Sequence, residues 1–186
     1  MLRKVAITGN IASGKSQVEK MLEENYPVYD TDRIAHEILD EIKYFYGYDV
    51  FTDGKIDRQK LGKLVFENQE IKRRLEEIVH PKVRERILQI FEKHRLEKVV
   101  FISVPLLFEA GFEDMFNKII FIKVNEIMQL NRLMARNGFS KEEALLRIKS
   151  QMSQAEKAKK SDFVIENNSS LKDLEDNLKI VLRKLL

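Results

Sequence analysis

Five short apolar runs, each containing β-branched residues, recur along the chain, and stretches with helical periodicity separate them. Continuous apolar runs of this length are typical of strands buried on both faces of a sheet. Strands that alternate with helices indicate a parallel sheet, joined by right-handed crossovers and covered by helices. We therefore expect an α/β fold. The runs are KVAIT (4–8), YPVYD (26–30), KVVFISV (98–104), KIIFIKV (118–124) and DFVIEN (162–167).

The spacing of these runs predicts two helical additions to the sheet. The segment 31–97 is far longer than a simple crossover needs and is mostly helical, although Pro81 is expected to kink or split its long pattern over 69–95. The segment 126–160 is also helical and is rich in Arg and Lys. The final stretch 170–186 begins with a Ser cap and predicts an amphipathic helix. The core of a single domain is then assigned to residues 1–30, 98–125 and 161–186.

Composition excludes several classes of protein. The 186 residues include 33 basic and 30 acidic side chains, and a net charge of +3 does not favour a nucleic-acid partner. The absence of Cys excludes disulfides, a thiol nucleophile and a Cys-based zinc site. No apolar stretch approaches the length of about 20 residues that spans a bilayer, and no signal peptide precedes the first run. We expect a soluble cytoplasmic protein.

The octapeptide GNIASGKS directly follows the first apolar run and precedes a helical pattern. Gly9 and Gly14 allow backbone conformations that turn several N–H groups inward, and the following helix adds its positive dipole end. Lys15 is expected to reach the β and γ phosphates of a nucleoside triphosphate, and the Ser16 hydroxyl to coordinate Mg²⁺. The predicted ATP-binding residues here are Gly9, Asn10, Ile11, Ala12, Ser13, Gly14, Lys15, Ser16 and Gln17.

Three classes of nucleotide protein use such a loop. A regulatory GTPase needs Asn-Lys-x-Asp after a late strand, but the only Asn-Lys here, Asn117–Lys118, leads into a strand. A mechanical ATPase usually carries an acidic residue at the end of a long apolar strand, and VVFISVP ends without one. Small-molecule kinases instead place acceptor-binding carboxylates after the second strand. The sequence favours this third class.

Asp30 and Asp32 follow the second run in YPVYDTDRIAHE. Two residues apart in an extended segment, both carboxylates would point to one side, into the crevice at the carboxyl end of the sheet. One carboxylate could accept the proton of an acceptor hydroxyl, and the other could hold a magnesium-bound water. The alternative is that either residue only caps the helix that begins near Arg33.

Over nearly its whole length the chain resembles the dephospho-CoA kinase family. The similarity is carried by GNIASGKS, DTDRIAHE, DGKIDRQKLGKLVF (53–66), LEEIVHPKVRERI (75–87), VPLLFEAGFED (104–114), QLNRLMARNGFSKEEALLRIKSQ (129–151) and SDFVIENNS (161–169). It implies a P-loop fold of the nucleoside-monophosphate-kinase type, with a five-stranded parallel core, a helical substrate-binding insertion and a mobile lid. It also implies transfer of the ATP γ-phosphate to the ribose 3′-hydroxyl of dephospho-CoA.

On this resemblance Asp32 contacts the acceptor hydroxyl and Asp30 lies nearer the metal, to which it is bound through water. The two roles could be exchanged. Thr8, at the end of the first run, is expected to orient the acceptor. ATP and Mg²⁺ are the implied co-substrate and metal.

Arg132, Arg136 and Arg147 lie in the basic lid region. A guanidinium that arrives on closure can stabilise the transferring phosphoryl group. Arg136 is the first choice for this role and Arg132 the second. The two residues share a helix face, and an anion bound between them would relieve the repulsion of their charges. Arg147 is assigned to ATP. The alternative is a solvated helix face with salt bridges.

His80, Pro105 and Leu106 match the acceptor side of the family. For His80 a core histidine in a kinked helix is the equal alternative. Glu109 is expected to set the hydrogen bonds of its loop rather than to touch substrate. Asn167 follows the fifth run, where such folds contact adenine, and turn formation is its alternative role.

Two departures from the family pattern concern the nucleotide loops. Asn10 and Ala12 occupy positions where the family is usually richer in Gly, and Ser161 and Ser169 replace its Ala and Gly near the last strand. The alternatives to dephospho-CoA phosphorylation are a kinase of the same fold for another hydroxyl compound or a nucleoside monophosphate, and a nucleotide-gated binding protein. A monomer or small homo-oligomer is expected.

Overall fold

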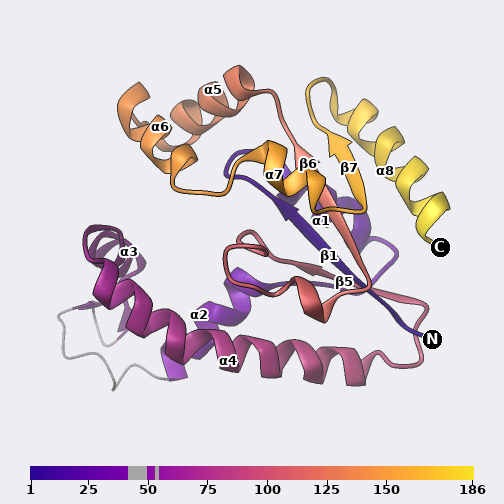
Figure 1. The fold of residues 1–186 in the computed structure, drawn as a ribbon, viewed down its shortest axis with the longest axis horizontal. Helices are drawn as coiled ribbons and strands as arrows, with labels where there is room; N and C mark the ends of the chain where they lie inside the picture. Colours follow the sequence, from indigo (N-terminus) through magenta and orange to yellow (C-terminus); the bar gives the residue numbers. More distant parts are fainter. Residues whose placement is uncertain (42–49, 53–54) are drawn as a thin grey trace. The chain divides into compact units, whose positions relative to one another are not determined.

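The computed structural model describes residues 1–41, 50–52 and 55–186, which form two compact units (Figure 1). The sheet unit comprises Met1–Asp30 and Phe91–Leu186, and the helical unit comprises Thr31–Ile90. Within the described residues no helix is both long and apolar enough to cross a membrane.

A five-stranded parallel sheet in the order β2-β5-β1-β6-β7 organises the sheet unit. All five predicted strands are present, and the predicted α/β fold is confirmed. The central strands are buried along nearly their whole length, which explains their continuous apolar sequences. The strands are β1 (Arg3–Gly9), β2 (Val28–Asp30), β5 (Val99–Ser103), β6 (Lys118–Lys123) and β7 (Phe163–Glu166).

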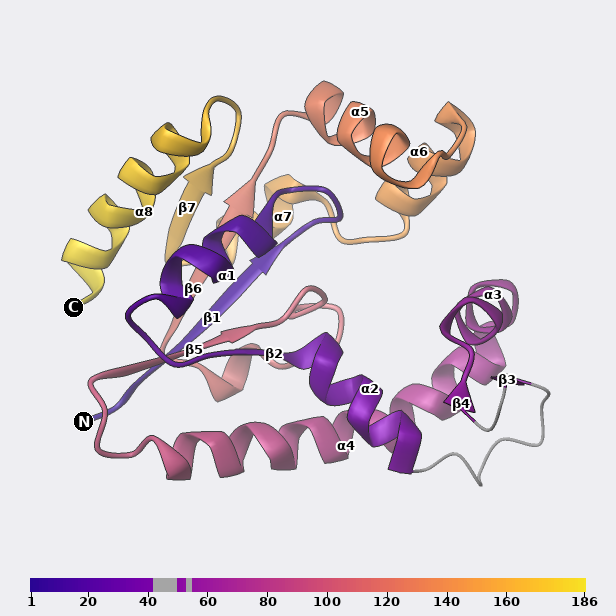
Figure 2. The ribbon, with the colours of Figure 1, turned by 180° about the vertical axis from the view of Figure 1, so that it is seen from behind.

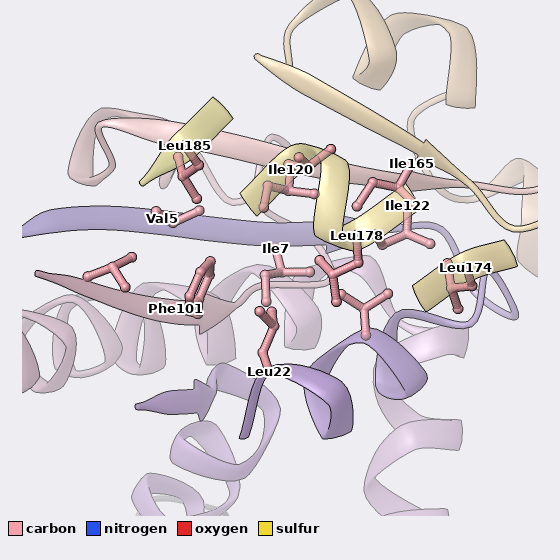
Figure 3. Packing of buried hydrophobic residues seen from close by; sticks show 13 residues of the cluster. Val5, Ile7, Leu22, Phe101, Ile120, Ile122, Ile165, Leu174, Leu178 and Leu185 are labelled. Atoms are coloured by element: carbon pink, nitrogen blue, oxygen red, sulfur yellow. The ribbon is translucent and has the colours of Figure 1, made fainter. Parts of the chain in front are cut away.

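Two helices, α1 (Lys15–Glu23) and α8 (Leu171–Leu185), cover one face of this sheet. In α8 the buried residues Leu174, Leu178, Val181 and Leu185 recur at steps of three and four, so one helix face is apolar. Figure 3 shows Leu22 and Leu178 pointing toward Ile7 of β1. Each buried Leu contributes about 1.5–3 kcal/mol by burial. As predicted, Ser170 caps α8, accepting a hydrogen bond from the Asp173 N–H.

The segment 126–160 forms three helices of the sheet unit. Asn125 caps the first of them and Gly138 ends it with a positive φ of 67°, while Ser140 and Ser153 each form a capping box with the Glu three residues later. The last of the three packs on β6. The helices are α5 (Glu126–Asn137), α6 (Lys141–Lys149) and α7 (Gln154–Lys159), and a short 3₁₀ helix, η2, spans Glu113–Met115.

The helical unit contains a two-stranded antiparallel ladder besides its helices. Its elements are α2 (Thr31–Glu41), β3 (Phe51–Thr52), β4 (Lys55–Ile56), α3 (Arg58–Glu67) and α4 (Gln69–Lys93), the last of which ends in the sheet unit.

Pro81 does not split α4, which continues as one helix of 25 residues (Figure 1). Of the two expected effects of Pro81, a kink or a split, the split is therefore ruled out. A proline inside a helix costs about 3 kcal/mol. Val79, Val83 and Ile87 are buried on both sides of Pro81, and their packing stabilises the helix through this position.

Candidate active site

The loop between β1 and α1 has the backbone of a phosphate-binding loop. Gly14 has a φ of 89° and directly precedes the first residue of α1, Lys15. Ala12 has a φ of 61°, a conformation that an L-residue adopts at a cost. At Gly9 a Cβ would lie 2.5 Å from Ser13 Oγ and 3.0 Å from the Ile122 carbonyl oxygen, so a larger residue would force its neighbours to shift. Figure 2 shows α1 following the end of β1 through this loop.

Side chains from the 126–160 segment bind the outer side of the loop. Gln129 Nε2 donates to the Ile11 carbonyl at 2.9 Å, and the Ile11 N–H donates to Gln151 Oε1 at 2.8 Å. Asn10 Nδ2 donates to the Met152 carbonyl at 2.9 Å. Gln129 is only 1% exposed, although it lies on a largely polar helix. These bonds hold the loop to the 126–160 segment.

Asn167, the residue after β7, supports the other end of the loop. Its Nδ2 donates to the Ser13 carbonyl at 2.8 Å, and its own carbonyl accepts from Arg132 Nη1 at 3.2 Å. A Cβ at Gly14 would lie 2.0 Å from Asn167 Nδ2. Glycine is therefore required here by close approach as well as by φ.

A cavity of about 360 Å³ opens beside this support. Pockets that hold small ligands begin at about 300 Å³. The cavity is lined both by polar groups and by apolar side chains of α8. This combination suits a heteroaromatic base with a charged tail. The lining residues are Gly14, Gln17, Arg132, Asn167, Ser169, Leu171 and Leu174.

Lys15 lies at the start of α1, and its ammonium group contacts the carboxylate of Glu19 and the hydroxyl of Ser103. Ser103 is the last residue of β5, level with Ile7 of β1 on one side and Asp30 of β2 on the other. The phosphate-loop lysine therefore reaches the carboxyl end of the sheet, one strand away from Asp30.

Asp30 and Asp32 are not both extended. Asp30 is the last residue of β2, and α2 begins at Thr31, so Asp32 lies in the first turn of a helix. The prediction that both carboxylates project from one side of an extended segment is wrong. An acidic residue in the first turn is favoured by the helix dipole, and the apolar run that specifies the strand ends at Asp30. Asp30 is half-buried and Asp32 is exposed.

The three arginines of the 126–160 segment have different surroundings. Arg132 is half-buried beside Asn167 and lines the cavity. Arg136 is exposed, and its Nε donates to Asn137 Oδ1 at 2.8 Å. Arg147 lies over the ring of Phe139, 4.5 Å from its centroid, and does not line the cavity. The structure therefore brings Arg132 to the phosphate loop.

The turn after β5 is held by an ion pair between a buried lysine and a partly exposed glutamate. Lys157 is fully buried; its ammonium group pairs with Glu109 at 2.8 Å and donates to the Pro105 carbonyl at 3.3 Å. Thr8, also fully buried, donates to the same carbonyl at 3.3 Å. Glu109 also accepts from the Met152 N–H, so it sets the hydrogen bonds of this loop as predicted. Leu106 is exposed at 41%.

His80 lies on α4 in the helical unit. Burial lowers the pKa of His80 below its usual value, the Arg84 and Lys72 charges act in the same direction, and Glu76 opposes them. His80 is therefore neutral at pH 7 and has one ring nitrogen that can donate and one that can accept a hydrogen bond.

A family model described as "Dephospho-CoA kinase" matches residues 3–173. The chain belongs to the dephospho-CoA kinase family. A curated dephospho-CoA kinase from Oceanobacillus iheyensis is 42% identical, covering 97% of this chain and 96% of the relative.

Solved structures agree with this family assignment. A dephospho-CoA kinase from Campylobacter jejuni superposes with a TM-score of 0.74 at 34% identity, over 100% of this chain and 98% of that one. A protein from Thermus thermophilus superposes with a TM-score of 0.83 at 40% identity, over 99% and 98%. The predicted family, P-loop kinase fold and enzyme class are confirmed. Location and oligomeric state remain predictions.

The oxygen donor beside the phosphate loop suits a Mg²⁺ ion that is also bound by the phosphates of a substrate. Among the described residues no three His, Cys, Asp or Glu side chains gather into a metal cage. Ser16 is exposed in the first turn of α1. Mg²⁺ prefers oxygen ligands and usually keeps several waters and substrate phosphates. One hydroxyl beside a phosphate loop fits that preference.

The sequence did not predict several residues that contact the phosphate loop or the turn after β5. Two residues of the 126–160 segment bind Ile11 of the loop, Gln129 and Gln151, and a third, Lys157, binds the Pro105 carbonyl of the turn. Two further residues, Glu19 and Ser103, contact Lys15. A polar Gln on the apolar face of a helix is one signal that could have revealed Gln129. A serine at the end of a buried strand gives no comparable signal.

Proposed function

We propose that the chain transfers the γ-phosphate of ATP to the ribose 3′-hydroxyl of dephospho-CoA, which gives coenzyme A and ADP. The observation that carries this proposal is the position of Lys15. It directly follows the last glycine of the loop 9–16 and contacts Ser103 at the carboxyl end of β5, in a chain of this family.

ATP would place its phosphates on the N–H groups of the loop 9–16 and on Lys15. The adenine base of ATP would enter the cavity that Asn167 and Gln17 help to line, and the volume of this cavity suits the base. Arg132 lines the same cavity and would reach the phosphate chain, and Arg136 and Arg147 would join it when the lid 126–160 closes.

Ser16 would hold Mg²⁺ together with the ATP phosphates, and Asp30 would bind it through a water. When bound, the metal neutralises charge on the transferring phosphate.

The acceptor would be the ribose 3′-hydroxyl of dephospho-CoA. Asp32 would accept the proton of the 3′-hydroxyl. The oxygen of that hydroxyl would form a bond to the γ-phosphorus, and the bond between this phosphorus and the bridging oxygen of ADP would break. Thr8, Pro105 and Leu106 would line the acceptor's path, with Thr8 acting through the Pro105 carbonyl to which it donates. Neutral His80 would contribute a hydrogen bond.

An ADP-release assay over a panel of acceptors tests the proposal. Rapid release with dephospho-CoA, and a product phosphorylated at the 3′ position by ³¹P NMR, is the expected result. Equal activity with several nucleoside monophosphates would favour another kinase of this fold. Slow turnover with every acceptor, despite tight ATP binding, would favour a nucleotide-gated binding protein.

A further inference from the structure

The phosphate-loop lysine has an acidic partner on its own helix. Lys15 and Glu19 are four residues apart on α1, and only 14% and 13% of their side chains are exposed. Ser103, fully buried at the end of β5, contacts the Lys15 ammonium group and donates to Glu19 Oε1 at 2.5 Å. The three side chains thus join the first turns of α1 to the central sheet.

This cluster differs from the other ion pairs of the helices. Pairs such as Arg33–Glu37 and Lys63–Glu67 have the same spacing but are more than half exposed, so water screens them. Lys15 and Glu19 are largely shielded, and a strand hydroxyl binds both. A carboxylate in this position acts on the lysine much more strongly than a surface pair would.

The same carboxylate opposes any phosphate that binds Lys15. A phosphate oxygen that reaches the ammonium group must replace the carboxylate as its counter-ion and then lies close to that carboxylate. Like charges at such distances repel, most strongly where solvent screening is low.

We propose that Glu19 is a positioning residue that holds Lys15 against the end of β5 in the nucleotide-free protein and weakens the affinity of the loop for the nucleoside diphosphate product. This inference rests on the proposed role of Lys15 as the phosphate-binding lysine. The function of the cluster is to keep ADP from remaining on the loop after transfer.

Calorimetric titration with ADP, without magnesium, tests Glu19→Gln against the wild-type chain. The amide keeps the size of the side chain and removes its charge, and we expect ADP to bind about tenfold more tightly. Glu23→Gln, exposed one turn later on α1, is the matched control and leaves ADP affinity unchanged. Unchanged or weaker ADP binding in Glu19→Gln overturns the proposal.

A second variant separates an electrostatic role from a structural one. Ser103→Asp in the Glu19→Gln background returns a carboxylate to Lys15 from the strand, and we expect the wild-type ADP affinity to return. A role of Glu19 in stabilising α1 alone would not be restored from β5. If Glu19→Gln does not fold, Glu19→Asp, which withdraws the charge by one methylene, is expected to tighten ADP binding about threefold. No tightening there overturns the proposal as well.

Lys15→Ala distinguishes the two proposals. If it leaves ADP affinity unchanged, the phosphate-site assignment fails. If it weakens ADP binding but Glu19→Gln does not strengthen it, only the role of Glu19 fails.

Discussion

The side-chain amide of Asn167 donates a hydrogen bond to the Ser13 carbonyl at 2.8 Å, joining residues 154 positions apart in the chain. Asn167 is only 7% exposed, and the missing Cβ of Gly14 is what allows the approach. The residue after the last strand therefore helps to define the phosphate loop that follows the first.

Replacing Asn167 by Ala is expected to weaken ATP binding. The Ser13 carbonyl loses its partner and the loop loses one support, which costs about 1–3 kcal/mol of stability. We expect a higher KM for ATP and a lower unfolding midpoint, measured by steady-state kinetics and urea unfolding. Asn177→Ala, exposed on α8, is the control, and wild-type values for Asn167→Ala would contradict the assigned contact.

Asp32→Asn tests the proposed proton acceptor. The amide cannot take up the hydroxyl proton, so kcat is expected to fall about 10²–10⁴-fold. ATP affinity, measured separately by calorimetry, is expected to stay within a factor of two or so, since the base and phosphate contacts proposed above lie on other residues. Glu37→Gln, an exposed acidic residue of the same helix, controls for the loss of charge. A fully active Asp32→Asn would remove Asp32 from the chemistry.

Ala12→Gly is expected to be nearly neutral in stability. The substitution relieves the positive φ of residue 12, worth about 1 kcal/mol, and this offsets the greater freedom of glycine in the unfolded chain. Ala135→Gly, exposed within α5, lacks this compensation and is expected to cost about 1 kcal/mol. Urea unfolding of both variants measures the difference, and an equal cost would argue against a strained Ala12.

Glu109→Ala is expected to destabilise the chain more than Lys157→Met does. Without Glu109 the fully buried ammonium group of Lys157 keeps the Pro105 carbonyl but loses its counter-ion. Breaking one side of a buried pair costs about 3–5 kcal/mol, and the partial exposure of Glu109 places this case near the lower end. Lys157→Met removes the buried charge itself and leaves a carboxylate that water can reach. The reverse order in urea unfolding would contradict this argument.

The lowered pKa of His80 makes stability depend on pH in the mildly acidic range. The unfolded chain takes up the proton first, near its usual pKa of about 6.5, so the contribution of neutral His80 is fully present above that pH. This contribution to the free energy of unfolding decreases as the pH is lowered, until the pH is below the pKa of His80 in the folded protein. His80→Gln is expected to lose less stability than the wild type between pH 7 and pH 5, in urea unfolding at each pH. Parallel curves would show that His80 does not titrate differently in the two states.

The five strands and α8 were predictable because local sequence specifies them. β1, β5 and β6 are buried along nearly their whole length, so their apolar runs are almost unbroken, and α8 carries both its cap and its apolar stripe. The helix that begins at Thr31 was placed too late, because Asp30 and Asp32 suit either a strand end or a helix start.

The contacts around Lys15 were less predictable because they join distant parts of the chain. Glu19 reads as an ordinary surface partner at helical spacing, and only Ser103, 88 residues from Lys15, shows that the pair is buried. The continuity of α4 through Pro81 also depends on tertiary contacts. A proline favours a split in an isolated helix, whereas buried residues on either side of Pro81 hold α4 together.

Several polar groups of the phosphate loop are hydrogen-bonded by the protein itself: Ile11 through both its N–H and its carbonyl, Asn10 through its Nδ2, and the Ser13 carbonyl through Asn167. The conformational entropy of ordering this segment is thus lost when the chain folds, not when nucleotide arrives. Association then requires no local folding step, and its rate is set by encounter and by the charge of the incoming phosphates.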